Sequence, residues 1–453
     1  MKKNEVNMLS GSIIKGLLTI ALPIMAMNVL QNLFNIIDMT LLGMLVGDNP
    51  VGAVGTCGSL ISLFTGLLIG ISAGANVVVA KFVGIGDEER VQRAIGTSLF
   101  FAIISGIALM IFGVVFAKPL LILINCPDSL LSKATIYFQL YFLGVPLLLI
   151  YNFSAAILRS VGNTKRPMYY ITIGGVIKVI LSFTIIFFLK LDVEGVAIAT
   201  IISWAIASIF CLRDLLKNTG IAQFKIKHFR FYWKELANVL FIGIPAGLEQ
   251  VMYSFANVVI TSTVNAVGPE ATKGISIANQ YDGIMYQIVM APSYAIMAYV
   301  SQNIGAKNPK RAQQSVLTAM GIAVILGLSF GLLSAAFSGP LSWIMSKNPT
   351  VIKYSKQKMM LISPTYFICG INAILAASLR GMEKPIIPTL SIMAFMCLIR
   401  FPWVWFIYPL LPSLTFLYLI WPIGWVLSIL TLLIFYFPTA SKLMKKNQTP
   451  TVA

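Results

Sequence analysis

The sequence predicts an all-α polytopic membrane protein with twelve transmembrane helices in two pseudo-symmetric six-helix lobes. Of its 453 residues, 58% are hydrophobic and only 11% are charged, and the mean hydropathy is +0.87. Its apolar runs are long enough to cross a bilayer, which takes about 20 residues, and the chain repeats itself halfway along. Only helices fit such runs, because backbone groups in lipid must be satisfied within the segment.

Six apolar runs fall in each half of the chain. In the first half they lie near residues 16–46, 53–80, 93–117, 134–158, 166–189 and 194–212. In the second half they lie near residues 236–264, 275–301, 316–338, 355–379, 385–409 and 413–438. An even number of spans per half brings both halves into the membrane from the same side, so we expect a pseudo-twofold axis along the membrane normal.

The repeat has a period of about 221 residues and is carried by loop residues. At that offset the matched pairs are Gly84 and Gly305, Arg90 and Arg311, Arg159 and Arg380, and Pro167 and Pro388. Near the start of each copy, Pro23 matches Pro245 with one residue of slippage. We therefore place one lobe at residues 1–220 and the other at 221–453. Such duplication in a membrane protein is typical of secondary transporters.

The net charge of +18 is concentrated in the turns that flank the apolar runs. Most of the 33 lysines and arginines fall on one side if both termini are cytoplasmic, which predicts that orientation in the plasma membrane. Attraction to anionic membrane lipid explains this excess of positive charge. We expect no nucleic acid as partner, because the sequence shows no pattern of basic and aromatic residues for such a surface.

Several other chemistries are not indicated. The chain has no GxxxxGK[ST], HExxH or GxSxG motif, so we expect no enzyme. Its five cysteines form no CxxC pair and fall mostly in apolar runs, which favours core positions over metal or disulfide roles. The one histidine, His228, is expected in a solvated loop. We expect no cofactor apart from H⁺ or Na⁺ as coupling ion, and no metal.

Five charged residues lie well inside predicted spans, away from the first residues of each span. They are Asp38, Lys178, Glu249, Asp282 and Arg400. A charge at the bilayer centre costs about 2.5–3.5 kcal/mol on insertion scales, so these residues must face a cavity or one another. A functional site is the first interpretation. A structural intramembrane pair, or snorkelling near a span end, is the alternative, and it applies most to Asp282.

The first span has a polar face. Gln31, Asn35 and Asp38 are four and three residues apart and therefore share one side of a helix, with Pro23 two turns earlier. A carboxylate on a kinked helix is suited to ion coupling, because protonation or Na⁺ binding changes its charge and can bias the position of the helix. A polar packing seam between helices is the other interpretation.

Over nearly its whole length the chain resembles the multidrug and toxic compound extrusion (MATE) antiporters. The resemblance rests on LPIMAMNVLQNLFNIIDMTLLG, GISAGANVVVAKFVGIGDEERVQRA and AAILRSVGNTKRP in the first copy, and on GIPAGLEQ, SQNIGAKNPKRA and LAASLRGMEKP in the second. It implies efflux of small amphipathic or cationic compounds in exchange for H⁺ or Na⁺. It also implies that Asp38 matches the carboxylate on which first-lobe coupling depends. We expect a monomer.

The sequence departs from the family pattern at both expected cation sites. Where many relatives carry an Asn and an Asp or Asn four residues apart in the fifth span, this chain has Lys178 and Ser182. Where some branches place an acid in the seventh span, it has Tyr253, with Glu249 one turn earlier, and the tenth-span acid corresponds to Cys369.

These departures lead to two predictions of contact. Lys178 takes the place of a bound cation and pairs with Asp38; alternatively, it faces a water-filled cleft or lipid and snorkels. Glu249 and Arg400 lie at similar depths in their spans and are predicted to interact. Alternatively, Glu249 faces the substrate alone. Gln31, Asn35, Ser182, Tyr253 and Asp282 are further candidates for the cavity.

Two other classes of function stay open. A lipid-linked oligosaccharide flippase would need a large basic cavity, whereas few basic residues are expected to face inward here, which favours amphipathic substrates. A membrane-embedded enzyme would need clustered acids or histidines, and the acidic run at residues 87–89 is better interpreted as a solvated loop.

Overall fold

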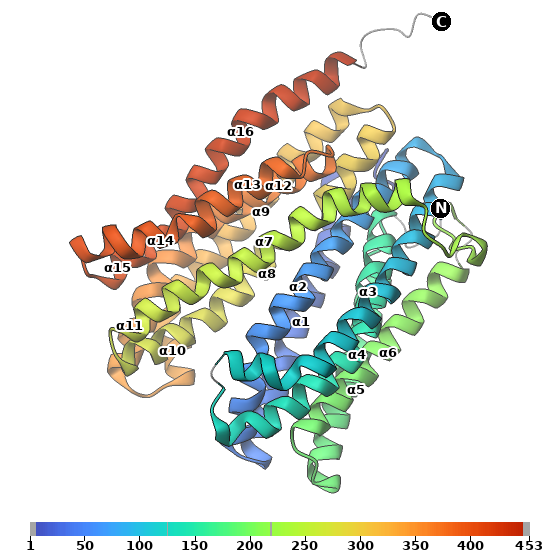
Figure 1. Cartoon of the computed structure of the whole chain (residues 1–453). Coiled ribbons are helices and arrows are strands. Elements are labelled where there is room, and N and C mark those ends of the chain that lie inside the picture. Colours follow the sequence, from blue (N-terminus) through green and yellow to red (C-terminus); the bar gives the residue numbers. More distant parts are fainter. Residues whose placement is uncertain (1–5, 125, 218–219, 447–453) are drawn as a thin grey trace, which may run out of the picture. The chain divides into compact units, whose positions relative to one another are not determined.

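The structure, a computed structural model, describes residues 6–124, 126–217 and 220–446 (Figure 1). Within these ranges it is helical, with twelve stretches long and apolar enough to cross a membrane, as predicted. The first six are α1 (Ile13–Leu45), α2 (Asp48–Ile85), α3 (Glu88–Leu123), α4 (Asp128–Ser160), α5 (Lys165–Leu189) and α6 (Val193–Lys217).

The second six spans are more broken than the first. They begin with α7 (Trp233–Asn265), α8 (Pro269–Gly305) and α9 (Pro309–Ala336), and a short α10 (Ser338–Met345) follows. The tenth span joins α11 (Pro349–Ile362), η2 (Ser363–Thr365) and α12 (Tyr366–Gly381). The eleventh joins α13 (Ile386–Ile392), η3 (Met393–Leu398), α14 (Arg400–Pro402), η4 (Trp403–Ile407) and η5 (Tyr408–Leu410), and the twelfth joins α15 (Leu414–Tyr418) and α16 (Ile420–Lys446).

The sequence repeat is visible in the helix ends. Asp87 caps α3 by accepting a hydrogen bond from the Arg90 N–H, and Asn308, 221 residues later, caps α9 by accepting one from the Arg311 N–H. In the turns, the left-handed φ of Gly86 (81°) returns at Lys307 (55°). The second copy thus keeps the turn geometry without the glycine that makes it easy to adopt.

The chain forms two compact units that divide inside helices. One unit holds residues 26–247 with the short segment before residue 8, and the other holds residues 8–25 and those from 248 onward. The two divisions inside helices fall two residues after a repeat-related proline, Pro23 in α1 and Pro245 in α7, and a third lies before α1, between residues 7 and 8. The predicted lobe boundary after residue 220 concerns the sequence repeat and stays a prediction, since the compact units divide elsewhere.

In the first unit, the early part of α7 packs closely on α2. A Cβ on Gly70 would lie 2.4 Å from the Cα of Gly247, and one on Gly74 would lie 2.1 Å from the carbonyl oxygen of Val239. Glycine is therefore required at both α2 positions for the two backbones to come this close.

The linker before α7 is folded onto α3. The Thr97 hydroxyl donates to the carbonyl oxygen of Arg230 and accepts from the N–H of Tyr232. The expectation of a solvated His228 is wrong: its side chain is buried and lies 2.8 Å from the Tyr232 hydroxyl. This burial lowers the pKa of His228, and the positive charge of Lys227 lowers it further.

Candidate functional site

The first candidate site is a polar cluster between α1 and α5 that is buried at Asp38, Lys178 and Ser182 and exposed at Asn35. The Lys178 Nζ lies 2.6 Å from Asp38 Oδ2, and both side chains are at least nine-tenths buried. The Ser182 hydroxyl donates to Asp38 Oδ1 at 3.1 Å, and the Lys178 amino group also donates to Asn35 Oδ1 at 3.3 Å. The predicted pairing of Lys178 with Asp38 is confirmed, and the alternative of a snorkelling Lys178 is excluded.

Helical spacing and one glycine build this cluster. Asn35 and Asp38 share a face of α1, and Lys178 and Ser182 are one turn apart on α5. A Cβ on Gly175 would lie 2.1 Å from a ring carbon of Phe34, so this glycine lets the two helices approach. Gln31, one turn before Asn35, is only partly buried. Asp38 is thus held by a cation and a hydroxyl, with its charge balanced.

In the second unit the predicted pair of Glu249 and Arg400 is wrong. Glu249 instead forms an ion pair and a hydrogen bond with Arg380, both side chains being about 85% buried. Arg380 belongs to the last turn of α12 and reaches back into the unit, whereas the sequence repeat predicts a loop residue. Depth along the spans alone would pair Glu249 with Arg400. The long side chain of Arg380, at a helix end, reaches Glu249 instead.

Arg400 is held by neutral groups. Its Nη1 donates to Asn257 Oδ1 at 2.6 Å, and its guanidinium carbon lies 5.0 Å from the ring centre of Tyr253 and 5.3 Å from that of Trp421. The residue is 2% exposed, and among the described residues no carboxylate lies within ion-pairing distance of it. It is a fully buried cation whose charge is not balanced by a direct partner.

The local backbone around Arg400 is unusual. It stands at the start of α14, between two π-helical segments, η3 and η4. Pro402 lacks an N–H, which removes one bond from the helical ladder and favours such a widened turn. Wide turns of this kind are frequent at functional sites.

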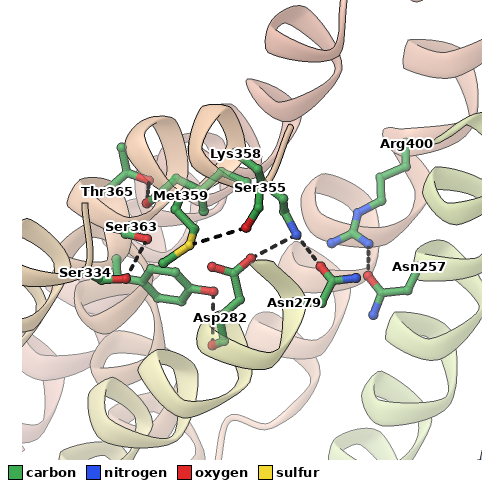
Figure 2. Close-up of polar contacts among 12 residues, drawn as sticks. Asn257, Asn279, Asp282, Ser334, Ser355, Lys358, Met359, Ser363, Thr365 and Arg400 are labelled. Carbon is green, nitrogen blue, oxygen red and sulfur yellow. Dashed lines mark hydrogen bonds and ion pairs between the residues drawn. The ribbon is translucent and has the colours of Figure 1, made fainter. Parts of the chain in front are cut away.

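The third buried charge of this unit is also paired. Asp282 forms an ion pair with Lys358 at 2.9 Å, and Lys358 donates a hydrogen bond to Asn279 as well. Asp282 therefore does not snorkel. Lys358, near the start of the predicted tenth span, is 3% exposed. Figure 2 shows this triad together with the pair of Arg400 and Asn257.

Some of these groups line a cavity of about 340 Å³ in the second unit, and Arg400 lies behind its wall, where it donates to the lining residue Asn257. Asn257, Asp282 and Lys358 line it, as do the aromatic side chains Tyr253, Tyr286, Tyr366, Tyr418 and Trp421. A smaller space of about 50 Å³ is lined by Glu249, Tyr253, Cys369 and Arg380. With Lys358, Arg380 and Arg400 all buried, the expectation that few basic residues face inward is wrong.

The two sites are related by the repeat. At an offset of 222, Asn35 corresponds to Asn257 and Lys178 corresponds to Arg400, and each amide oxygen accepts a hydrogen bond from its cation. Asp38 corresponds to Ile260, so the second copy keeps the cation and the amide but has no carboxylate. At the 221-residue offset of the loops Lys178 aligns with Ile399 instead, so the match appears only at the offset of 222 that also relates Pro23 to Pro245.

Metal and redox chemistry has little support in the described part of the chain. There it contains no group of three or more His, Cys, Asp or Glu side chains that could hold a metal ion. All five cysteines are buried and free, as small core residues are expected to be.

Twelve membrane-length spans in a duplicated chain, with buried charges inside each unit, define a polytopic membrane transporter. The sequence model of the MatE family matches residues 23–184 and 245–406, one match for each copy. The chain therefore belongs to the MATE transporter family and is not an enzyme.

Curated relatives match most of the chain. The probable multidrug resistance protein YoeA of Bacillus subtilis is 25% identical over 374 residues, which cover 81% of each chain. A protein of Shewanella oneidensis named as an FAD transporter is 26% identical over 392 residues, covering 84% of this chain and 85% of its own. The probable multidrug resistance protein NorM of Thermotoga maritima is 25% identical over 384 residues, covering 83% of this chain and 81% of its own.

Solved structures share the fold. One is described as the outward-facing conformation of a multidrug resistance MATE family transporter; it superimposes with a TM-score of 0.90 at 19% identity, covering 98% of this chain and 99% of its own. Another, a MOP superfamily transporter from Pyrococcus furiosus described as having reverse polarity of its binding pocket, has a TM-score of 0.88 at 18% identity, covering 99% of this chain and 100% of its own. At these identities the likeness establishes the fold alone.

Proposed function

We propose that this protein is a secondary antiporter that exports small amphipathic molecules across the plasma membrane in exchange for protons, by alternating access. The observation that carries the proposal is the buried ion pair of Lys178 and Asp38 in the first unit, at 2.6 Å. The coupling groups are these two residues, with Asn35 and Ser182 as their hydrogen-bonding partners.

Protons suit this cluster better than Na⁺ does. The Lys178 ammonium already neutralises the Asp38 carboxylate, so a metal ion would have to displace it. Protonation of Asp38 would leave the ammonium as an uncompensated buried charge, which is strongly unfavourable. The cluster would then rearrange or release a proton from Lys178, and either event would bias the positions of α1 and α5.

Small molecules of drug size fit the second-unit cavity. A volume of about 340 Å³ lies in the range of ligand pockets, which are lined mostly by apolar and aromatic groups with a few placed polar ones. Names of relatives support small-molecule export, since two are called probable multidrug resistance proteins and one an FAD transporter. A lipid-linked oligosaccharide would need a larger space, so the flippase alternative has less support.

Orientation and assembly complete the proposal. The excess of lysine and arginine in one set of loops favours cytoplasmic termini and contact with anionic membrane lipid. We propose a monomer, since each buried site is completed by residues of one chain.

The proposal is tested by reconstituting the protein into liposomes and imposing pH and Na⁺ gradients separately. Efflux of a fluorescent amphipathic dye should follow the pH gradient and should be absent from liposomes without protein. Dye movement that ignores both gradients would overturn the antiport mechanism.

A further inference from the structure

We infer that the cavity of the second unit binds an organic anion: an aromatic body that carries a phosphate, sulfate or carboxylate group. The claim that this anion is the exported substrate specifies the proposed function and rests on it. The claim that the cavity binds the anion is separate and has its own test. Such an anion differs from the cationic compounds that the resemblance to MATE antiporters implies.

The buried charges in the wall of the cavity and behind it sum to a positive value. Asp282 is balanced by Lys358 at 2.9 Å, and in the adjoining space Glu249 is balanced by Arg380. Arg400 remains as the third cation, directly behind the lining residue Asn257, to which it donates a hydrogen bond. The buried charges of this unit thus leave one positive charge without an acidic partner.

The repeat shows which partner is missing. In the first unit the equivalent cation, Lys178, is balanced by Asp38, and Ile260 stands at the equivalent position in the second unit. Ile260 lines the cavity and so borders the space in which a ligand would lie. A buried charge is costly unless it is paired, and an anionic ligand would supply what the side chain does not.

Arg400 and Lys358 both lie close to one aromatic side chain, Trp421. The Trp421 ring centre lies 5.3 Å from the Arg400 guanidinium carbon and 5.5 Å from the Lys358 Nζ, and Trp421 lines the cavity. Asn257 and Asn279 cap the two head groups and also line it. An oxyanion held by Lys358 and Asn257, with Arg400 directly behind Asn257, would therefore leave its aromatic body against Trp421 and the nearby tyrosines, where stacking is favourable.

Binding is tested with three probes of one shape in phosphatidylcholine nanodiscs. The probes are 1-naphthyl phosphate, the neutral 1-naphthol and the cationic trimethyl(1-naphthyl)ammonium, with affinities measured by isothermal titration calorimetry. We expect the phosphate to bind at least about tenfold more tightly than either of the others, the range of a charge-assisted hydrogen bond. Preferential binding of the ammonium probe by the unmodified protein would overturn the inference, whatever the variants do.

Arg400→Gln should remove the preference for the phosphate probe and leave the affinity for 1-naphthol nearly unchanged, while Arg400→Lys should retain part of it. The matched control is Arg166→Gln, which removes an arginine paired with Asp214 in the first unit and should change none of the three affinities. An unchanged phosphate preference in Arg400→Gln would also overturn the inference. So would loss of probe binding on adding phosphatidylglycerol, because a lipid headgroup would then be the occupant.

Failure of the proposed function gives a different result. If the phosphate probe binds as expected but no gradient drives its movement in proteoliposomes, the binding site stands and the antiport mechanism fails.

Discussion

Two buried cations at equivalent positions of the repeat, Lys178 and Arg400, have opposite electrostatic settings. Lys178 is matched by Asp38 at 2.6 Å in a closely packed cluster. Arg400 has the same amide partner but no carboxylate, and the groups around it line a cavity of about 340 Å³. The two copies differ here by one acid, which separates a neutral pair, suited to holding and releasing a proton, from a positive site suited to a ligand.

The backbones differ in the same sense. Lys178 stands in a regular α-helix, α5, whereas Arg400 stands between π-helical turns next to Pro402. The residue that corresponds to Pro402 in the first copy is Ile180, so the widened turn belongs to the second copy alone among these two spans. The first cation thus lies in a regular helix, whereas the second lies in an irregular one behind the wall of a cavity.

The largest expected effect comes from removing the acid that distinguishes the two sites. Asp38→Asn should abolish gradient-driven efflux while insertion into the membrane persists, because the amide keeps the shape but cannot change its charge. The matched variant Ile260→Asn, at the equivalent position of the second copy, should retain efflux. Full gradient-driven efflux by a correctly inserted Asp38→Asn protein would show that this carboxylate does not couple the ion.

Breaking the balanced pair of the second unit should reduce stability. Arg380→Gln leaves Glu249 buried without its partner, which should lower the free energy of unfolding by about 3–5 kcal/mol. Adding Glu249→Gln to that variant should restore much of the loss. Thermal unfolding in detergent measures both, and a single variant as stable as the unmodified protein would mean that water or another group compensates Glu249.

Restoring the missing acid should make the second site resemble the first. Ile260→Asp places a carboxylate at the position equivalent to Asp38, where it would compete with a ligand for Arg400. Binding of 1-naphthyl phosphate should weaken by about tenfold, and Ile260→Asn should have a smaller effect. Equal weakening by both variants would attribute the loss to packing and not to charge.

The smallest expected effect concerns the turns that the two copies share. Lys307 holds a left-handed φ of 55° where the first copy has Gly86. Lys307→Gly should therefore raise the free energy of unfolding by about 0.5–1 kcal/mol. Thermal unfolding checks the sign, and a destabilised variant would show that the side-chain contacts of Lys307 outweigh the backbone strain.

The sequence predicted the helical architecture well because apolar length and duplication are properties of the chain itself. All twelve spans were found, and Lys178 was placed against Asp38 because both lie inside spans and a buried charge requires a partner. Local spacing also placed Asn35 on the face of Asp38.

The second-unit site could not be predicted in the same way, for two physical reasons. Lys358 and Arg380 lie near span ends in the sequence, and only the packing of their helices shows that they turn inward. Glu249 and Arg400 have matching depths, but depth fixes one coordinate and leaves the direction of each side chain around its helix undetermined. The correspondence of Lys178 with Arg400 was present in the sequence and required the 222-residue alignment.

The most direct test is efflux from proteoliposomes by the unmodified protein and by Lys178→Asn, under pH and Na⁺ gradients imposed one at a time. If Lys178 takes the place of a bound cation, the unmodified protein should respond to the pH gradient alone. Lys178→Asn, which vacates that position beside Asp38, should then acquire a dependence on Na⁺. Efflux that is driven by Na⁺ in the unmodified protein and keeps the same ion preference in Lys178→Asn would contradict the assignment.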